Sequence, residues 1–109
     1  SHNRIGDVLV ARSDLPEALK SHQSSHAIFE RLARADESNA GLQRDLSVSH
    51  EKIGDIQEQL GDLDATVEAY EASLVIARSL AERFPDHPQF QSDLVITKER
   101  LAELRAKLI

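Results

Sequence analysis

Residues 53–74 read IGDIQEQLGDLDATVEAYEASL, and this stretch decides the fold. It predicts two helices joined by a tight turn, because apolar residues recur every three or four positions on both sides of Gly61 and Asp62. Glycine suits the left-handed residue that ends a helix, and aspartate suits the N-cap of the next helix. The apolar stripe consists of Leu42, Leu46, Ile53, Ile56 and Leu60 in the first helix and of Leu63, Val67, Tyr70, Leu74 and Ile76 in the second.

The same pattern also occurs earlier in the chain, in a register that places position 4 on position 52. RIGDV at 4–8 aligns with KIGDI at 52–56, and SDLPEA at 13–18 aligns with GDLDAT at 61–66. In the same alignment QRDLSVSHEK at 43–52 falls on QSDLVITKER at 91–100. We therefore expect one continuous domain over 1–109, with copies at about 4–51 and 52–99 and a partial third copy that extends to 109.

The expected fold is all-α, because the chain is rich in helix-forming residues and contains only four Gly and three Pro. Helices are predicted at roughly 1–12, 15–35, 39–60, 63–84 and 88–108, about five in all, and successive helices form antiparallel pairs. Two further N-cap signals support these bounds. Asp14 with Glu17 forms a capping-box pattern, and Asp86 with Gln89 forms another.

The same alignment also bears on where the chain begins. It places Ser49 and His50 on Ser1 and His2, so the chain is expected to begin partway along a helix that is complete only in the later copy. We therefore expect a fragment of a longer protein in which further copies precede residue 1.

On these residues the chain resembles the tetratricopeptide (TPR) repeat family. The family's pattern of a small residue in the first helix, a turn, and then alternating small and aromatic residues has counterparts in both copies. They are Ile53-Gly54, Gly61-Asp62, Thr66, Tyr70 and Ser73 in one copy, and Ile5-Gly6, Ser13-Asp14, Ala18, His22 and Ser25 in the other. The resemblance implies antiparallel helix pairs stacked in a right-handed superhelix that binds other proteins.

This chain also departs from the family pattern. Its period is longer than usual, and the proline that ordinarily ends the second helix is displaced to Pro85, so the helices should be longer. His2 and His50 stand where the family often has a large aromatic residue. The long period resembles that of bacterial arrays with DLSVS and IGD motifs, which implies a bacterial protein with signalling or effector domains nearby.

The family resemblance further implies that the first helix of each copy lines a concave groove. The groove residues would be Asn3 and Asp7, then Glu51, Asp55 and Glu58, then Glu99 and Glu103, with Arg4, Lys52 and Arg100 beside them. Such a mostly acidic groove suits a protein or peptide segment that carries Lys or Arg. Alternatively, Arg4–Asp7, Lys52–Asp55 and Arg100–Glu103 are ion pairs on the helix surface, each contributing a few tenths of a kcal/mol.

Members of the family that bind chaperones hold a C-terminal carboxylate with Lys and Asn at set groove positions. This chain has Asn3, Asp7, Glu51, Asp55, Ile96 and Glu99 there. A carboxylate ligand among so many acids would be repelled, so a carboxylate clamp is not expected.

Two histidines raise the question of a metal site. His22 and His26 are four residues apart, and Glu30 extends the row, which is a possible face for a divalent metal. The competing interpretation is packing between helices, because His22 aligns with Tyr70 and His26 aligns with Leu74. Packing is the interpretation we adopt, so no metal and no cofactor is expected.

The composition narrows the classes of partner. The formal charge is −6 and the basic residues are scattered, so nucleic acid is not an expected partner. There is no Cys, which excludes disulfides and thiolate chemistry and permits a reducing compartment. No apolar run approaches the ~20 residues of a membrane span, so a cytoplasmic location without membrane contact is expected.

An enzyme is not expected either. Ser24, Ser25, Ser47 and Ser49 lie within predicted helices, without the glycine-rich turn or oxyanion-hole motif that a serine nucleophile requires, and we interpret them as small packing residues. The predicted function is a scaffold that binds a partner peptide or helix in its groove. The alternative is a structural spacer or a self-association module that oligomerises through its exposed repeat ends.

Overall fold

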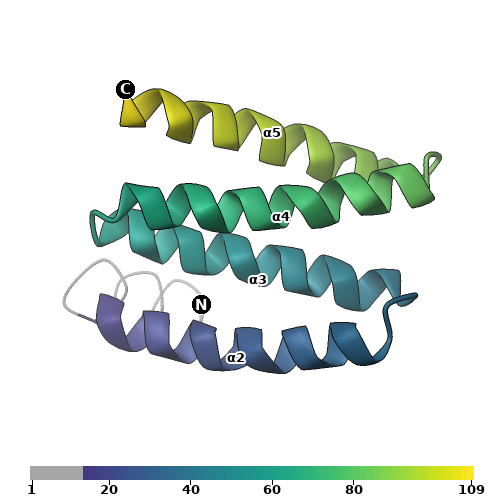
Figure 1. The fold of residues 1–109 in the computed structure, drawn as a ribbon, viewed down its shortest axis with the longest axis horizontal. Coiled ribbons are helices and arrows are strands. Elements are labelled where there is room, and N and C mark those ends of the chain that lie inside the picture. Colours follow the sequence, from purple (N-terminus) through teal and green to yellow (C-terminus); the bar gives the residue numbers. More distant parts are fainter. Residues whose placement is uncertain (1–13) are drawn as a thin grey trace, which may run out of the picture.

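The computed structural model describes residues 14–109, and this part of the chain is all-helical. Its helices are α2 (Leu15–Ala35), α3 (Ala40–Gln59), α4 (Leu63–Arg83) and α5 (Pro88–Leu108) (Figure 1). All four agree with the sequence prediction to within one residue at each end. The fifth predicted helix, at 1–12, lies outside the described residues.

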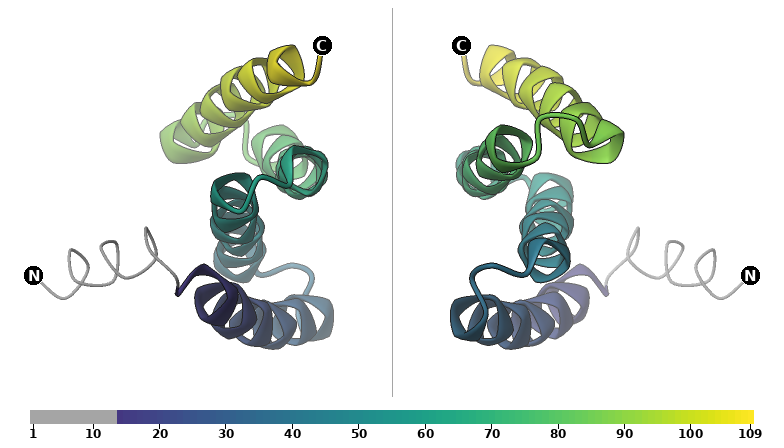
Figure 2. Two further views of the ribbon diagram at one scale, coloured as in Figure 1. Left: turned by 90° about the vertical axis from the view of Figure 1, so that its left-hand side faces the viewer. Right: turned by 90° about the vertical axis from the view of Figure 1, so that its right-hand side faces the viewer.

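The chain turns back at every loop, so that consecutive helices are antiparallel. Figures 1 and 2 show the helices in the order α2, α3, α4, α5 across the molecule, with α3 and α4 in the middle. Each helix packs mainly against its neighbours in sequence. Because α2 and α5, at the two ends of this order, do not pack against each other, the helices of residues 15–108 form an open stack and not a closed bundle.

The turn between α3 and α4 forms as its residues predict. Gly61 has a φ of +87°, a left-handed conformation that L side chains rarely adopt. The Asp62 side chain then caps α4 by accepting a hydrogen bond from the Ala65 backbone N–H (3.1 Å).

The two other predicted caps have different outcomes. Asp14 is the N-cap residue of α2 as predicted, but the expected capping-box hydrogen bond is absent, because its side chain makes no capping hydrogen bond. Pro16 lies in the first turn of α2 and supplies no N–H, so fewer donors there need a cap. At α5 the N-cap is His87 and not Asp86, because the Nδ1 of His87 accepts from the Phe90 backbone N–H (3.3 Å).

The loops before α3 and α5 occupy equivalent places in the two copies and share their geometry. Asn39 and His87 precede α3 and α5 with nearly equal backbone angles, φ −80° and ψ 100° against φ −85° and ψ 108°. The Gln43 side chain donates to the carbonyl of Ala33 (3.1 Å), and the Gln91 side chain donates to that of Ala81 (2.9 Å). In both loops a glutamine one turn into a helix thus satisfies a carbonyl near the end of the preceding helix.

The core lies where α4 packs against its neighbours. Val67, Tyr70, Leu101 and Leu104 form one buried cluster between α4 and α5, with Leu63 and Leu74 packed against it. On the α3 side Gly54 lets the two helices approach closely. A Cβ built on Gly54 would lie 3.0 Å from the Cβ of Ala69 and 3.3 Å from the Tyr70 ring.

Two predictions about buried side chains need correction, one in the apolar stripe and one among the serines. Leu60 is 43% exposed, because it forms the C-cap of α3 instead of its last buried turn. Among the helical serines, Ser47 and Ser49 are buried packing residues as predicted, whereas Ser24 and Ser25 are exposed on α2. Ser24 and Ser25 are exposed because α3 is the one described helix that packs against α2.

Candidate functional site

The predicted groove residues divide among three places. Glu51, Lys52, Asp55 and Glu58 lie on α3, and Glu99, Arg100 and Glu103 lie on α5. Asn3, Arg4 and Asp7 lie outside the described residues. The structure brings the side chains of α3 and α5 together along a row that we call the polar seam. It consists of Arg44, Ser47, Glu51, Asp55 and Glu58 on α3, Tyr70 and Ser73 on α4, and Asp93, Arg100 and Lys107 on α5.

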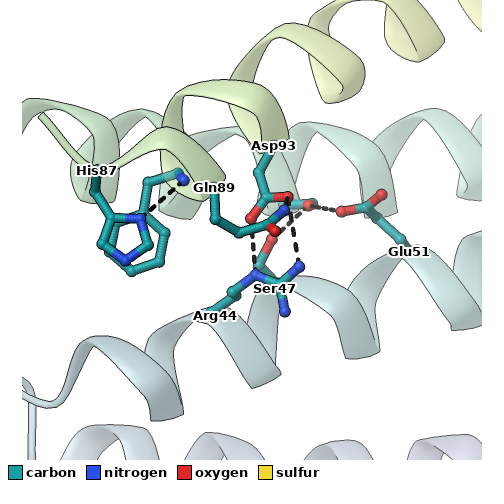
Figure 3. Close-up of polar contacts among 8 residues, drawn as sticks. Arg44, Ser47, Glu51, His87, Gln89 and Asp93 are labelled. Carbon is teal, nitrogen blue, oxygen red and sulfur yellow. Dashed lines mark hydrogen bonds and ion pairs between the residues drawn. The ribbon is translucent and has the colours of Figure 1, made fainter. Parts of the chain in front are cut away.

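One end of the polar seam is an ion pair between α3 and α5. The Nε of Arg44 donates to a carboxylate oxygen of Asp93 (2.8 Å), and Gln89 donates to the other oxygen (2.8 Å) (Figure 3). The hydrogen bond to Asp93 raises the pKa of Arg44. Because Asp93 is held from both sides, this end of the seam is fixed in geometry.

The middle of the polar seam is a chain of hydroxyl and carboxylate groups. Ser47 and Ser73 share a buried hydrogen bond (2.8 Å), and the Ser73 hydroxyl lies 2.6 Å from a carboxylate oxygen of Glu51 (Figure 3). Burial raises the pKa of Glu51, while the hydrogen bond from Ser73 acts in the opposite direction. A half-buried carboxylate that lacks a cation within contact distance is costly, which is why its hydrogen bond to Ser73 matters.

The other end of the polar seam gathers Asp55, Glu58, Tyr70 and Arg100. The Tyr70 hydroxyl donates to Asp55 (2.6 Å), and the Arg100 guanidinium lies over the Tyr70 ring (5.6 Å to its centre) and pairs with Glu58. Burial and the hydrogen bond to Asp55 both raise the pKa of Tyr70, so its hydroxyl remains a donor.

Glu58 also accepts from Lys107 (3.1 Å), and Arg100 lies 3.7 Å from Glu103. Burial raises the pKa of Glu58, but the hydrogen bonds and charges of Lys107 and Arg100 outweigh it and lower the pKa overall. Glu58 is therefore ionised and clamped between two cations of α5.

The three predicted ion pairs have different outcomes. Arg100–Glu103 is confirmed. Lys52–Asp55 is wrong within the described residues, because Asp55 accepts from Tyr70 of the next helix and Lys52 is exposed without such a contact. Arg4–Asp7 lies outside the described residues.

The cross-helix partners Arg44, Asp93 and Lys107 were not predicted from the sequence. The repeat pattern gave no signal for them, since position 44 is Arg in one copy and its equivalent in the next, position 92, is Ser. Ser73 was assigned only as a small packing residue, although its hydroxyl bonds both Ser47 and Glu51. Contacts between helices that are not neighbours in sequence depend on how far the stack twists, which helical periodicity does not specify.

A second polar group lies between α2 and α3. One ring nitrogen of His26 lies 3.0 Å from the Ser49 hydroxyl and the other lies 3.5 Å from Glu30, and the His50 ring meets the His26 ring edge-on. Burial, helped by the nearby His26, lowers the pKa of His50 to about 4. His26 therefore packs at a helix interface as predicted, and residues 14–109 contain no group of three or more metal-type side chains.

The described surface has hollows beside α2, and two of them bear on the predicted sites. One of about 680 Å³ lies between α2 and α4, with Gln43 and Leu46 of α3 among its lining residues. The other, of about 360 Å³, lies along α2 and α3 and is lined by residues that include His22, Ser25 and Lys52. Neither hollow contains the acids of the polar seam.

Comparison of the chain with protein-family models, with curated proteins and with solved structures gave no match. The resemblance to tetratricopeptide repeats thus depends on the residues of this chain alone and stays a prediction. None of the helices at 15–108 combines the length and apolarity needed to cross a membrane.

Proposed function

We propose that the chain is a protein-interaction scaffold of the tetratricopeptide type, in which helix pairs continue as a right-handed superhelix and a partner segment binds along the α3–α5 face. The observation that carries this proposal is the convergence of Asp55 and Glu58 from α3 with Arg100 from α5 at one end of the polar seam, where Glu103 lies beside Arg100. Two helices separated in sequence thereby present polar side chains on a common face.

Charge favours a basic partner segment. Asp55, Glu99 and Glu103 are all exposed, and neither Asp55 nor Glu99 has an ion-pair partner within residues 14–109. The cations Arg44 and Arg100 are already engaged by Asp93 and Glu58. Lysine or arginine side chains on a partner would meet the unpaired acids, and complementary charge favours both encounter and specificity.

The scaffold is preorganised for binding. Ion pairs and hydrogen bonds hold α3, α4 and α5 to one another, so a bound segment would not have to order these helices. A preformed surface loses less conformational entropy on binding than a flexible one does. The proposal includes a bacterial, cytoplasmic protein that acts by binding and not by catalysis.

The test is binding of a fluorescently labelled, lysine-rich amphipathic helical peptide, followed by anisotropy. The variant Asp55→Lys/Glu99→Lys/Glu103→Lys should weaken binding by about tenfold or more, equivalent to ~1.4 kcal/mol. The matched control is Glu37→Lys/Glu68→Lys/Glu82→Lys, which changes the net charge equally at exposed positions on other surfaces. If both variants weaken binding to the same extent, the effect is general charge attraction and the groove proposal fails.

The second candidate function is a spacer or self-association module. It is favoured by exposed apolar residues on α5, where Val95 and Ile96 are 53% and 57% exposed. Light scattering separates the two candidates. A dimer that grows with protein concentration and disappears in Val95→Ser/Ile96→Ser supports self-association, and a monomer at all concentrations rejects it.

A further inference from the structure

Of the described helices, α2 is the one most weakly held in the stack. Ala33 is its one buried residue, whereas α3, α4 and α5 each bury at least four. Among residues 14–109, α2 packs mainly against α3, while α3 and α4 each have a packing partner on both sides. An element with little buried surface opens at a lower free energy than the core of a domain does. Therefore α2 can detach while the other helices stay folded.

The contact between α2 and α3 is centred on two histidines. The ring of His26 on α2 meets the ring of His50 on α3 edge-on, with 4.3 Å between their centres. One nitrogen of His26 lies 3.0 Å from the Ser49 hydroxyl, which is the one side-chain to side-chain hydrogen bond between these helices in the described part of the chain. Glu30 lies 3.5 Å from the other nitrogen and also pairs with Arg34. A charge on either ring therefore acts at the point that joins the two helices.

The folded chain resists protonation of His50. The ring is half-buried, and burial together with the neighbouring His26 holds its pKa at about 4, against 6.5 for an ordinary histidine. Glu30 acts in the opposite direction, and no ionisable group of α4 acts on His50 within residues 14–109. Because a released ring takes up the proton more readily, acid favours any state in which His50 is free. This effect sets in as the pH falls below 6.5.

The polar seam that joins α3 to α5 behaves differently in the same pH range. Burial raises the pKa of Glu58, but Lys107 and Arg100 outweigh it, so Glu58 keeps its charge until the pH falls below its ordinary pKa of 4.5. Burial raises the pKa of Glu51 against the hydrogen bond from Ser73, so protonation of Glu51 favours the folded chain. Between pH 6.5 and pH 4.5, acid thus weakens the contact at His50 and spares the contacts of these two seam residues.

We propose that the two histidines form an acid-sensitive switch, in which a proton on His50 releases α2 from α3 while α3, α4 and α5 stay packed. In the stack the protonated ring would lie partly buried beside His26, whereas in the opened state it is hydrated. Opening also uncovers Ala33 and Leu46, which line the hollow between α2 and α4. Acid thereby exposes an apolar edge of the stack.

Amide hydrogen exchange of the whole chain tests the proposal, followed by NMR at pH 7 and pH 5 in low concentrations of urea. After correction for the intrinsic exchange rate at each pH, amides of α2 should exchange through an opening with a lower free energy and a smaller urea dependence than the opening that exposes α4. The pKa values of His50 allow the equilibrium constant of this opening to rise at most about 20-fold from pH 7 to pH 5. Solvent screening of the half-buried ring should reduce the rise to about fivefold.

Variants of His50 separate the switch from a general effect of acid. His50→Gln and His50→Phe should both remove most of the rise, because neither side chain takes up a proton, and phenylalanine also keeps an aromatic ring against His26. His22→Gln is the matched control, because it removes a half-buried histidine of α2 outside this pair and should keep the rise.

Two results would overturn the proposal. One is that amides of α2 and α4 share a single opening free energy and a single urea dependence at pH 5, because the opening is then global. The other is that the rise persists in both His50 variants, because the proton then acts elsewhere.

Discussion

Replacing Gly54 by Ala should destabilise the fold, although alanine is the better helix former. In a helix interior, the higher helix propensity of alanine alone would stabilise the fold by about 1 kcal/mol. The new methyl group would meet the Ala69 Cβ at 3.0 Å and the Tyr70 ring at 3.3 and 3.4 Å. The Ala69 Cβ is fixed directly to the backbone of α4 and cannot rotate away, so α3 and α4 must separate, and such overpacking costs ~1–3 kcal/mol.

The expected net loss is about 1 kcal/mol of unfolding free energy, or about 4 °C in Tm for a chain of this size. Urea and thermal unfolding followed by circular dichroism would measure it. The compensating variant Gly54→Ala/Ala69→Gly removes the blocking methyl group and should return to within ~0.5 kcal/mol of the natural chain, since the two propensity changes cancel.

Gly41→Ala is the control for helix propensity. A Cβ at Gly41 would meet only the Asn39 side chain, at 3.3 Å, so this variant should show stabilisation of up to the ~1 kcal/mol that propensity gives. If Gly54→Ala stabilises the chain as propensity alone predicts, or if the double variant shows simple additivity, the close contact between α3 and α4 is refuted.

Three further perturbations follow from the packing, the loops and the buried histidine. Leu104→Ala removes a side chain with 0% exposure and should cost about 3 kcal/mol in urea unfolding, whereas Leu108→Ala at 45% exposure should cost well under ~1 kcal/mol. Gln43→Ala and Gln91→Ala should each lower the unfolding free energy by about 1 kcal/mol in thermal unfolding, because each removes one of the two equivalent loop hydrogen bonds. The two losses should add in the double variant, since the loops are far apart. Clearly unequal losses would contradict the equivalence of the loops. The pKa of His50 is about 4 in the folded chain and 6.5 ordinarily, so protonation of His50 favours the unfolded chain. The unfolding free energy that neutral His50 contributes is fully present above pH 6.5 and is lost as the pH falls toward 4. Allowing for solvent screening, the urea midpoint should report a loss of about 1 kcal/mol between pH 7 and pH 5, and His50→Gln should lose less over the same range.

Much of the fold could be predicted because its determinants are local. Gly61 and Asp62 mark the turn between α3 and α4, and both adopt the predicted conformations. Apolar periodicity predicted the positions of the four described helices, since each helix must bury its apolar stripe wherever its neighbours lie. His87 was missed as the cap of α5 because histidine is not among the preferred N-cap residues, although its ring nitrogen can accept the same hydrogen bond.

The candidate site could be predicted only in part. Glu58 and Arg100 were both named as groove residues, and the structure pairs them across two helices. Sequence spacing instead suggested that Lys52 pairs with Asp55, because residues three apart on one helix are the neighbours that periodicity reveals. Tyr70 bonds Asp55 instead, and that contact depends on the approach of α3 and α4 at Gly54.

A crystal structure of the whole chain would test the stacked, duplicated helix pairs most directly. Residues 15–59 should superpose on residues 63–107, with the side chains of Gln43 and Gln91 bonded to Ala33 and Ala81 in matching loops. Helices closed into a bundle, with α2 packed on α5 and the two segments unable to superpose, would contradict it.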